Sequence, residues 1–256
     1  MINITSTSTF TIPKENNLEN KDTILLPKKI QGGYIFAIAD GVGKKKGAKL
    51  ASKTAIEYLD KINDIKELSD IILVFNMIKT ILVNISNKDE SIKDMATTLT
   101  LCIISPTYIK VAHTGDCRLY IDKYKNKKLI QLTNDQSEHQ KLLKDGVFTK
   151  EELKNHPRKH ALSSALSPNM KVEVEEKEEK ILSEEMSIFI MSDGAYNYYE
   201  DDSDYYKLSL ANINEFSFKL EQDILKKGAK DDSSFIAVKI LKSKEQNKYS
   251  NDKNKI

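Results

Sequence analysis

The sequence of 256 residues is poor in several residue types that mark common protein classes. It contains no tryptophan, nine glycines, five prolines and only two cysteines, Cys102 and Cys117. The two cysteines do not form a CxxC pair, so a cysteine-based zinc cage is excluded. Such sparse cysteine usage favours a reducing compartment over an oxidising one.

Neither sign of charge is in excess. The 40 Lys and Arg residues oppose 38 Asp and Glu residues, which gives a formal net charge of +2. A nearly neutral chain lacks the positive charge that attracts nucleic acid or an acidic membrane surface. We therefore expect neither of them as a partner.

Long hydrophobic runs and a targeting segment are also missing. The most apolar run, Ile71 to Ile85, is too short to span a bilayer and is interrupted by Asn76 and Lys79. Its apolar positions follow helical spacing, which predicts an amphipathic core helix. The N-terminus has no basic segment followed by an apolar one, so we expect no signal peptide. These features predict a soluble cytoplasmic protein.

Short runs rich in β-branched residues and separated by turns predict strands. They are Thr23–Leu26, Tyr34–Ala39, Thr98–Ile104, Tyr108–His113, Arg118–Ile121, Leu129–Leu132, Lys171–Val174, Ser187–Met191 and Ser234–Leu241. Helical patterns occupy Ala48–Ile62, Glu67–Ser86, Ile213–Lys227, and, more briefly, Ser137–Lys144 and Glu151–Asn155. Asp135 with Glu138 and Thr149 with Glu152 are expected to cap the two short helices.

The order of these elements predicts the fold class. Strands occur in groups and helices in pairs, which favours an α+β layered domain over a doubly wound parallel sheet. We expect one domain over residues 1–241. Residues 242–256 are rich in Lys, Asn and Ser and have almost nothing to bury, so a disordered tail is predicted there.

Two apolar strands end in the same dipeptide. The segments IFAIADGVG (35–43) and IFIMSDGAY (188–196) both finish in Asp-Gly, at Asp40 and Asp193. An Asp-Gly turn is common by itself. Two of them could nevertheless bring two carboxylates to one edge of a sheet.

Other acidic residues follow the same pattern, and nucleotide-binding loops do not fit it. The segment DGVGKKKG (40–47) lacks the glycine spacing of a P-loop and of a dinucleotide fingerprint. Asp116 and Asp231 also adjoin apolar strand-like segments. Carboxylates are the oxygen ligands that Mg²⁺ and Mn²⁺ prefer. The four residues together therefore favour a hard-metal site over four unrelated turns.

Seven motifs in sequence order carry a resemblance to a known family. They are NKD (20–22), FAIADGVG (36–43), MATTLTLCII (95–104), VAHTGDCRLYI (111–121), a segment from Leu132 to Leu166, IFIMSDGAY and KDDSSFIAVKI (230–240). Together they resemble the metal-dependent protein phosphatases of the 2C type, particularly the compact bacterial ones. The resemblance implies a four-layer α/β/β/α sandwich of two central antiparallel sheets flanked by helices, with a flap at about 135–166.

The resemblance also implies a set of roles at two Mn²⁺ or Mg²⁺ ions. Asp40 would bridge the ions, the carbonyl of Gly41 would bind one, and Asp193 with Asp231 would complete the set. Asp116 would serve a weaker third ion with Asp193, and Asp22 would lie just behind the ligands. A water between the metals would then attack phosphoserine or phosphothreonine in a protein, which explains why no protein nucleophile is recognisable.

The chain departs from the family pattern at six positions. They are Asn17 for a phosphate-binding Arg, Lys21 for Glu, Lys44 for Gly, Ala96 for Gly, Gln136 for His, and Asn197 for an Asp used by some members. We predict that Lys44 supplies a positive charge near the phosphate, as a substitute for the missing Arg. The alternative is that the run Lys44 to Lys46 is only solvated.

Three functional hypotheses follow from these residues. The first is a protein phosphatase that opposes a bacterial Ser/Thr kinase and works as a monomer. The second, prompted by Asn17 and Lys21, is a weak or inactive relative that binds phosphoproteins as a regulator. The third is an enzyme acting on a small phosphorylated metabolite. Retention of Asp40, Asp193 and Asp231 favours an enzyme.

Overall fold

Two antiparallel sheets form the centre of the molecule. The computed structural model describes residues 2–15, 19–43, 46–122, 128–146, 148–149, 152, 161–181, 184–208 and 212–242. The first sheet has the order β1 (Ile2–Ile12), β10 (Ser233–Lys242), β9 (Glu185–Met191), β6 (Arg118–Ile121), β7 (Ile130–Gln131). The second has the order β2 (Thr23–Ile30), β3 (Gly33–Ala39), β4 (Leu99–Ile104), β5 (Tyr108–Thr114), β8 (Glu175–Lys180).

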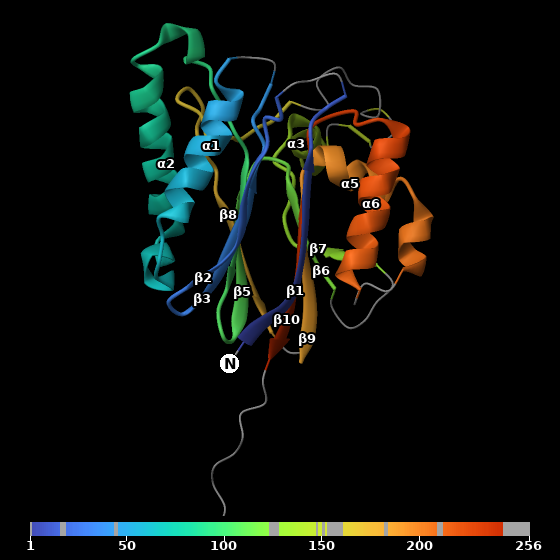
Figure 1. The fold of residues 1–256 in the computed structure, drawn as a ribbon. Coiled ribbons are helices and arrows are strands. Elements are labelled where there is room, and N and C mark those ends of the chain that lie inside the picture. Colours follow the sequence, from blue (N-terminus) through green and yellow to red (C-terminus); the bar gives the residue numbers. More distant parts are fainter. Residues whose placement is uncertain are drawn as a thin grey trace, which may run out of the picture.

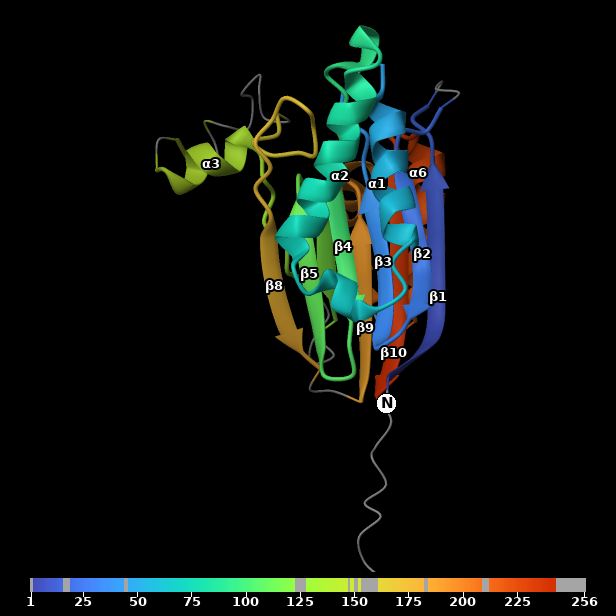
Figure 2. The same cartoon turned by 90° about the vertical axis from the view of Figure 1, so that its left-hand side faces the viewer.

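Helices cover both outer faces of the sheet pair (Figure 1). Helices α1 (Ala48–Asp60) and α2 (Ile71–Ser86) lie over the second sheet, and α5 (Asp193–Glu200) and α6 (Ile213–Lys227) lie over the first. Helix α3 (Glu138–Lys144) lies to one side, beyond the upper end of β8 (Figure 2). Three short 3-10 helices complete the described part: η1 (Ile65–Leu68), η2 (Glu90–Ile92) and η3 (Ser203–Lys207). The predicted four-layer α/β/β/α sandwich is confirmed.

The alternation of side chains along each strand explains how the layers pack against one another. In β3, Phe36 and Ile38 belong to the core between the sheets, whereas Ile35 and Ala37 pack under α1 and α2. Successive side chains of a strand point to opposite faces, so a strand buried on both faces is apolar throughout.

None of the helices in the described ranges is both long and apolar enough to cross a membrane.

The layer of α5 and α6 rests on an aromatic core. Phe189 of β9 lies 5.1 Å from Phe216 of α6, measured between ring centroids. Met191, the last residue of β9, and Tyr199 of α5 belong to the same buried cluster. This packing fixes α5 directly against the end of β9.

Several predicted elements are confirmed, and β6 and α6 have the predicted bounds. The remaining predicted strands, apart from the one at Lys171–Val174, and the main helices are present with shifted ends. The Thr149–Glu152 capping bonds are also present, since Thr149 N–H donates to Glu152 at 2.8 Å and Glu152 N–H donates to Thr149 at 3.3 Å. The rest of the helix predicted at Glu151–Asn155 lies outside the described residues.

The structure corrects other predictions. Strand β1 was not predicted, because its Ser/Thr-rich sequence lacks a strong apolar pattern and it pairs only at a sheet edge. No strand forms at Lys171–Val174, where Val172 and Val174 pack without strand pairing against the core beneath α1 and α2. The charged edge strand β8 follows directly, from Glu175. Charged side chains are common on exposed edge strands. Because they remove the apolar alternation, such a strand is hard to predict from the sequence.

Two helix starts also differ from the prediction. Helix α5 was expected to be a turn, and α3 is capped by Ser137, whose hydroxyl accepts from Gln140 N–H, and not by Asp135. Lys242, the first residue of the predicted tail, is instead the last residue of β10. The tail's other residues lie outside the described ranges.

Candidate metal centre

The predicted site residues meet at one end of the sandwich. Strands β3, β5 and β9 end there, and β2, β6 and β10 begin there, as the pairs Thr23↔Ala39 and Arg118↔Met191 show. The acidic residues at these strand ends are Asp22, Asp40, Asp116, Asp193, Asp231 and Asp232. Figure 1 shows this end at the top of the sheets.

The backbone of Asp40 is held by the segment that leads into β4. Asp40 N–H donates to the Thr98 hydroxyl at 3.0 Å, while the Thr97 hydroxyl and Thr98 N–H donate to the Asp40 carbonyl at 2.9 and 2.8 Å. These bonds use the main chain and leave the carboxylate available. At Gly41 a Cβ would lie 2.7 Å from the Ala48 carbonyl oxygen, so only glycine fits the turn.

Asp193 is the first residue of α5 and follows β9 after one residue, Ser192. Ser192 joins this turn to β10, because its N–H donates to the Ser234 carbonyl at 3.0 Å and its hydroxyl accepts from Ser234 N–H at 2.8 Å. A carboxylate at a helix N-terminus is stabilised by the helix dipole. At Gly194 a Cβ would lie 2.2 Å from the Asp232 carbonyl oxygen. Glycine is therefore required because two backbone segments touch here.

Asp116 lies in the turn between β5 and β6. The preceding Gly115 has φ +109°, and a Cβ there would lie 2.5 Å from the Thr98 side chain. The Gln136 side-chain carbonyl accepts from Gly115 N–H at 3.0 Å and from the Thr114 hydroxyl at 3.1 Å. Gln136, which replaces the family's His, therefore holds the Asp116 turn in place.

Arg118 fastens the same region to α5 and to the segment before α3. Its guanidinium makes two hydrogen bonds to Asp135, at 2.9 and 2.7 Å, and an ion pair with Glu200 at 2.7 Å. The guanidinium carbon also lies 3.8 Å from the ring centroid of Tyr196. Asp135 therefore acts as the partner of an arginine and not as the helix cap predicted for it.

The site carboxylates are close enough to affect one another. Burial, then Asp22, Asp193, Asp116 and Asp231, raise the pKa of Asp40 well above its usual value. Burial is also the main cause that raises the pKa of Asp22 to about 7, of Asp116 to about 8 and of Asp193 to about 6. The fold has therefore gathered the predicted ligand carboxylates, and those of Asp40, Asp116 and Asp193 resist ionisation in the absence of a cation.

The donor set fits a hard divalent cation. Both carboxylate oxygens of Asp22 are buried and lack a hydrogen-bond partner among the described residues, and the nearby Ser234 and Ser192 hydroxyls only partly offset the rise in its pKa. Buried carboxylates without protein partners are compensated by a bound cation. No three His, Cys, Asp or Glu side chains in the described ranges already stand in an arrangement that could hold an ion. The ligand assignments therefore stay predictions.

Asp232, the neighbour of Asp231, has a structural role. Its carboxylate accepts from Lys14 N–H at 2.7 Å and from Lys21 N–H at 2.9 Å, which ties both ends of the connection from β1 to β2. The Lys21 ammonium donates to the Gly43 carbonyl at 2.8 Å. Lys21, which stands where the family has Glu, therefore clamps the loop that carries Asp40 and Gly41.

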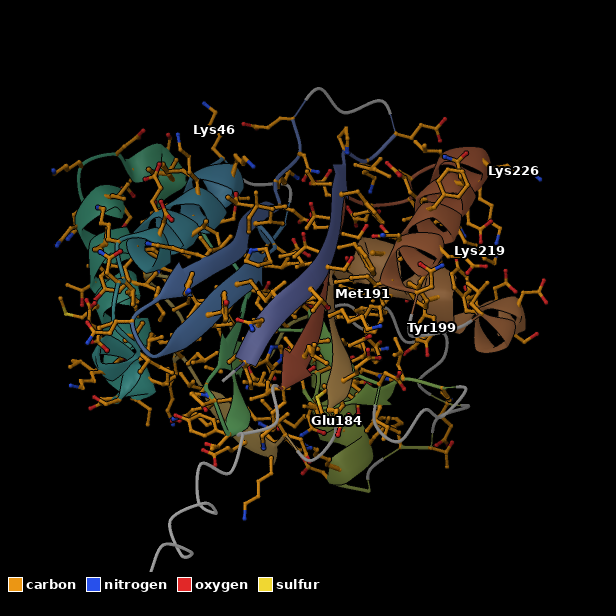
Figure 3. All side chains as sticks on the ribbon, turned by 60° about the horizontal axis from the view of Figure 1, so that its bottom comes forward. Lys46, Glu184, Met191, Tyr199, Lys219 and Lys226 are labelled. Carbon is orange, nitrogen blue, oxygen red and sulfur yellow. The ribbon has the colours of Figure 1, made fainter. Side chains whose placement is uncertain are left out.

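A lysine that sequence reasoning missed lies at the site. The Lys14 ammonium is 3.7 Å from a carboxylate oxygen of Asp231 and also lowers the pKa of Asp193. The family resemblance places the phosphate-binding position at Asn17 instead, and no local signal in the sequence points to Lys14. Asn17 and Lys44 lie outside the described residues, and Lys46 is exposed at the periphery (Figure 3).

Comparisons with known proteins show a family match and a shared fold. The Protein phosphatase 2C family profile matches residues 14–217. The serine/threonine phosphatase stp of Listeria monocytogenes is 33% identical over 152 residues, covering 55% of this chain and 58% of that protein. The chain thus spans somewhat over half the length of this relative.

Solved structures share the fold. The serine/threonine phosphatase PstP/Ppp of Mycobacterium tuberculosis matches with a TM-score of 0.77 and 21% identity, covering 93% of this chain and 99% of that one. The catalytic domain of PstP in complex with two manganese ions matches with a TM-score of 0.76 and 20% identity, covering 94% and 100%.

Proposed function

The chain belongs to the protein phosphatase 2C family, and from this premise we propose that it hydrolyses phosphoserine and phosphothreonine in proteins with the help of divalent metal ions. The observation that supports the proposal most is the convergence of four carboxylates, those of Asp22, Asp193, Asp116 and Asp231, on Asp40. A purely structural turn has no use for buried, mutually repelling acids. A metal-assisted hydrolase needs such a set of oxygen donors.

We propose the following ligands for two Mn²⁺ or Mg²⁺ ions. Asp40 would contact both ions, Gly41 would offer its carbonyl, and Asp193 with Asp231 would complete the set. Such ions supply Lewis acidity, which activates water and neutralises charge on the phosphoryl group. We propose that either Mn²⁺ or Mg²⁺ can occupy these positions.

The surrounding residues would keep these ligands in position. Thr97 and Thr98 hold the main chain of Asp40, and Ser192 holds the start of α5. Asp116 together with Asp193 would bind a weaker third ion, and Asp22 would lie behind the ligands.

The proposal extends to the setting of the enzyme. We infer phosphorylated proteins as substrates, a Ser/Thr kinase as the opposing enzyme, a cytoplasmic monomer, one catalytic domain over 1–241 and a flap at about 135–166. Lys44 remains our proposed phosphate contact. Among the described residues no feature favours the alternative of an inactive phosphoprotein-binding regulator.

One assay tests the function directly. The full chain is expected to hydrolyse p-nitrophenyl phosphate and a phosphothreonine peptide with Mn²⁺, and to lose that activity in EDTA. Activity that survives the chelator would contradict the metal mechanism. Metal binding without hydrolysis of either substrate would instead support the regulator alternative.

A further inference from the structure

In the ion pair between Lys14 and Asp231, hydrogen bonds hold the backbone of Lys14, whereas its ammonium group is held only loosely. Lys14 N–H donates to Asp232 at 2.7 Å, and Glu15 N–H donates to the Ala229 carbonyl at 2.9 Å. Two consecutive backbone bonds therefore anchor Lys14 to the same loop that carries Asp231. The ammonium, by contrast, is 3.7 Å from Asp231, and the two side chains are 44% and 57% exposed.

Another cation near the site, Arg118, is committed elsewhere. Arg118 also lowers the pKa of Asp193, yet its guanidinium is already bound by Asp135 and Glu200. Lys14 makes no such strong contact, since its one ion pair in the described part of the chain is with Asp231. Its charge is therefore the one that can leave the carboxylates at small cost.

Asp231 is correspondingly open to exchange of its partner. One of its oxygens accepts from Asp232 N–H at 3.0 Å, and the same oxygen faces the Lys14 ammonium. A metal ion at Asp231 and an ammonium at Asp231 compete for the same negative charge. Two cations that share a ligand also repel each other.

We propose that Lys14 neutralises Asp231 before a metal ion binds, and that metal binding releases its ammonium to contact the phosphate of the substrate. Both halves rest on the proposed metal ligands, and the second half rests also on the proposed hydrolysis of phosphoproteins. Lys14 thus serves in turn as a competitor of the metal and as a partner of the phosphate. A dianionic phosphate beside the ions attracts the released charge.

Removing the charge should therefore have two opposite effects. We expect Lys14→Met to bind Mn²⁺ about two- to fivefold more tightly, which corresponds to about 0.4–1 kcal/mol at 1.4 kcal/mol per tenfold change. An exposed ion pair has about this worth. We expect the same variant to raise KM for a phosphothreonine peptide several-fold at saturating Mn²⁺. A residue with only a structural role would not improve metal binding while weakening substrate binding.

The experiment uses the full chain, first stripped of metal with EDTA. Isothermal titration with Mn²⁺ alone measures metal affinity, and steady-state kinetics measures KM and kcat. The matched control is Lys53→Met, because Lys53 forms an ion pair of the same 3.7 Å length with Glu57 on α1, with both side chains similarly exposed. Lys14→Arg keeps the charge and is expected to retain the metal affinity of the unaltered chain.

The outcomes are distinguishable. Unchanged or weaker Mn²⁺ binding by Lys14→Met overturns the competition, whatever the activity. Tighter binding with an unchanged KM overturns the phosphate contact alone. If the unaltered chain binds Mn²⁺ but hydrolyses nothing, the proposed function fails while the titration still decides the competition. Tighter binding by Lys53→Met would show a general effect of net charge and overturn the proposal.

Discussion

The acidic residues at the site are costly to the fold when no cation is bound. Asp193 illustrates this, because burial and the neighbouring Asp231 raise its pKa while the Gly194 N–H at the start of α5 lowers it. Residues that oppose stability locally are expected where binding requires them. The role of each acid can therefore be tested through stability and activity together.

At the residue scale we predict opposite effects of Asp193→Asn on activity and on stability. Loss of a metal ligand removes several kcal/mol of transition-state stabilisation, so kcat/KM should fall about 100-fold or more. The metal-free variant should melt at a higher temperature, because one of the repelling charges is gone. Enzyme kinetics and thermal melts in EDTA measure the two effects.

The matched control for this change is Asp201→Asn, at the exposed C-terminal cap of the same helix. It should alter neither kcat/KM nor the melting temperature appreciably. An Asp193→Asn enzyme within tenfold of the unaltered kcat/KM would refute the assignment of Asp193 as a ligand.

At the scale of elements, three separate segments depend on one side chain. Arg118 begins β6, and it binds Asp135 before α3 and Glu200 at the end of α5. Its guanidinium can make these contacts at once because it is planar and carries five N–H donors. The turn that contains Asp116 therefore has its position set by α5 and by the segment before α3 together.

We predict that Arg118→Lys destabilises the protein although it preserves the charge. An ammonium cannot reproduce the paired bonds to Asp135 and the contact with Glu200, and loss of charged hydrogen bonds costs about 1.5–3 kcal/mol each. Denaturant unfolding in saturating Mn²⁺ measures the change in free energy. The control is Lys93→Ala, whose exposed pair with Glu90 should contribute little to stability. Equal stability of Arg118→Lys and the unaltered chain would show that the paired geometry is unimportant.

At the scale of the whole molecule, the carboxylate cluster should make stability depend on pH and metal. In the metal-free protein the pKa of Asp22 is raised to about 7 and that of Asp116 to about 8. A carboxyl whose pKa is higher in the folded state binds its proton more strongly there. Its stabilising contribution is complete at low pH and is lost as the pH rises through the folded pKa.

We therefore predict that the metal-free protein melts at a lower temperature at pH 8 than at pH 6.5. A loss of about 2 kcal/mol over this interval would lower the melting temperature by roughly 5 °C. Saturating Mn²⁺ should remove most of this slope, because the cation compensates the ionised carboxylates. Calorimetry in EDTA and in Mn²⁺ measures both curves. A metal-free melting temperature that rises between these pH values would contradict the electrostatic account.

Much of the fold follows from local sequence patterns. β-Branched runs predicted most strands, helical periodicity predicted α1, α2 and α6, and the strand-Asp-Gly units located Asp40 and Asp193 at the same end of the sheets. These signals are readable because period-two and period-3.6 burial are properties of neighbouring residues. Where burial is one-sided and the exposed residues are charged or hydroxylated, as in β1 and β8, the pattern was too weak.

The sequence by itself determined which elements form and which acidic residues stand at their ends. Only the tertiary structure decided which N–H groups and cationic side chains contact these acidic residues. Lys14 and Asp232 are separated by 218 positions and are nevertheless joined by a hydrogen bond, because β1 and β10 pair as neighbours in the first sheet. Likewise Arg118 meets Glu200 only after β6 and β9 pair and α5 folds back over the first sheet. Contacts of this kind depend on how strands are ordered in a sheet, and no local spacing encodes that order.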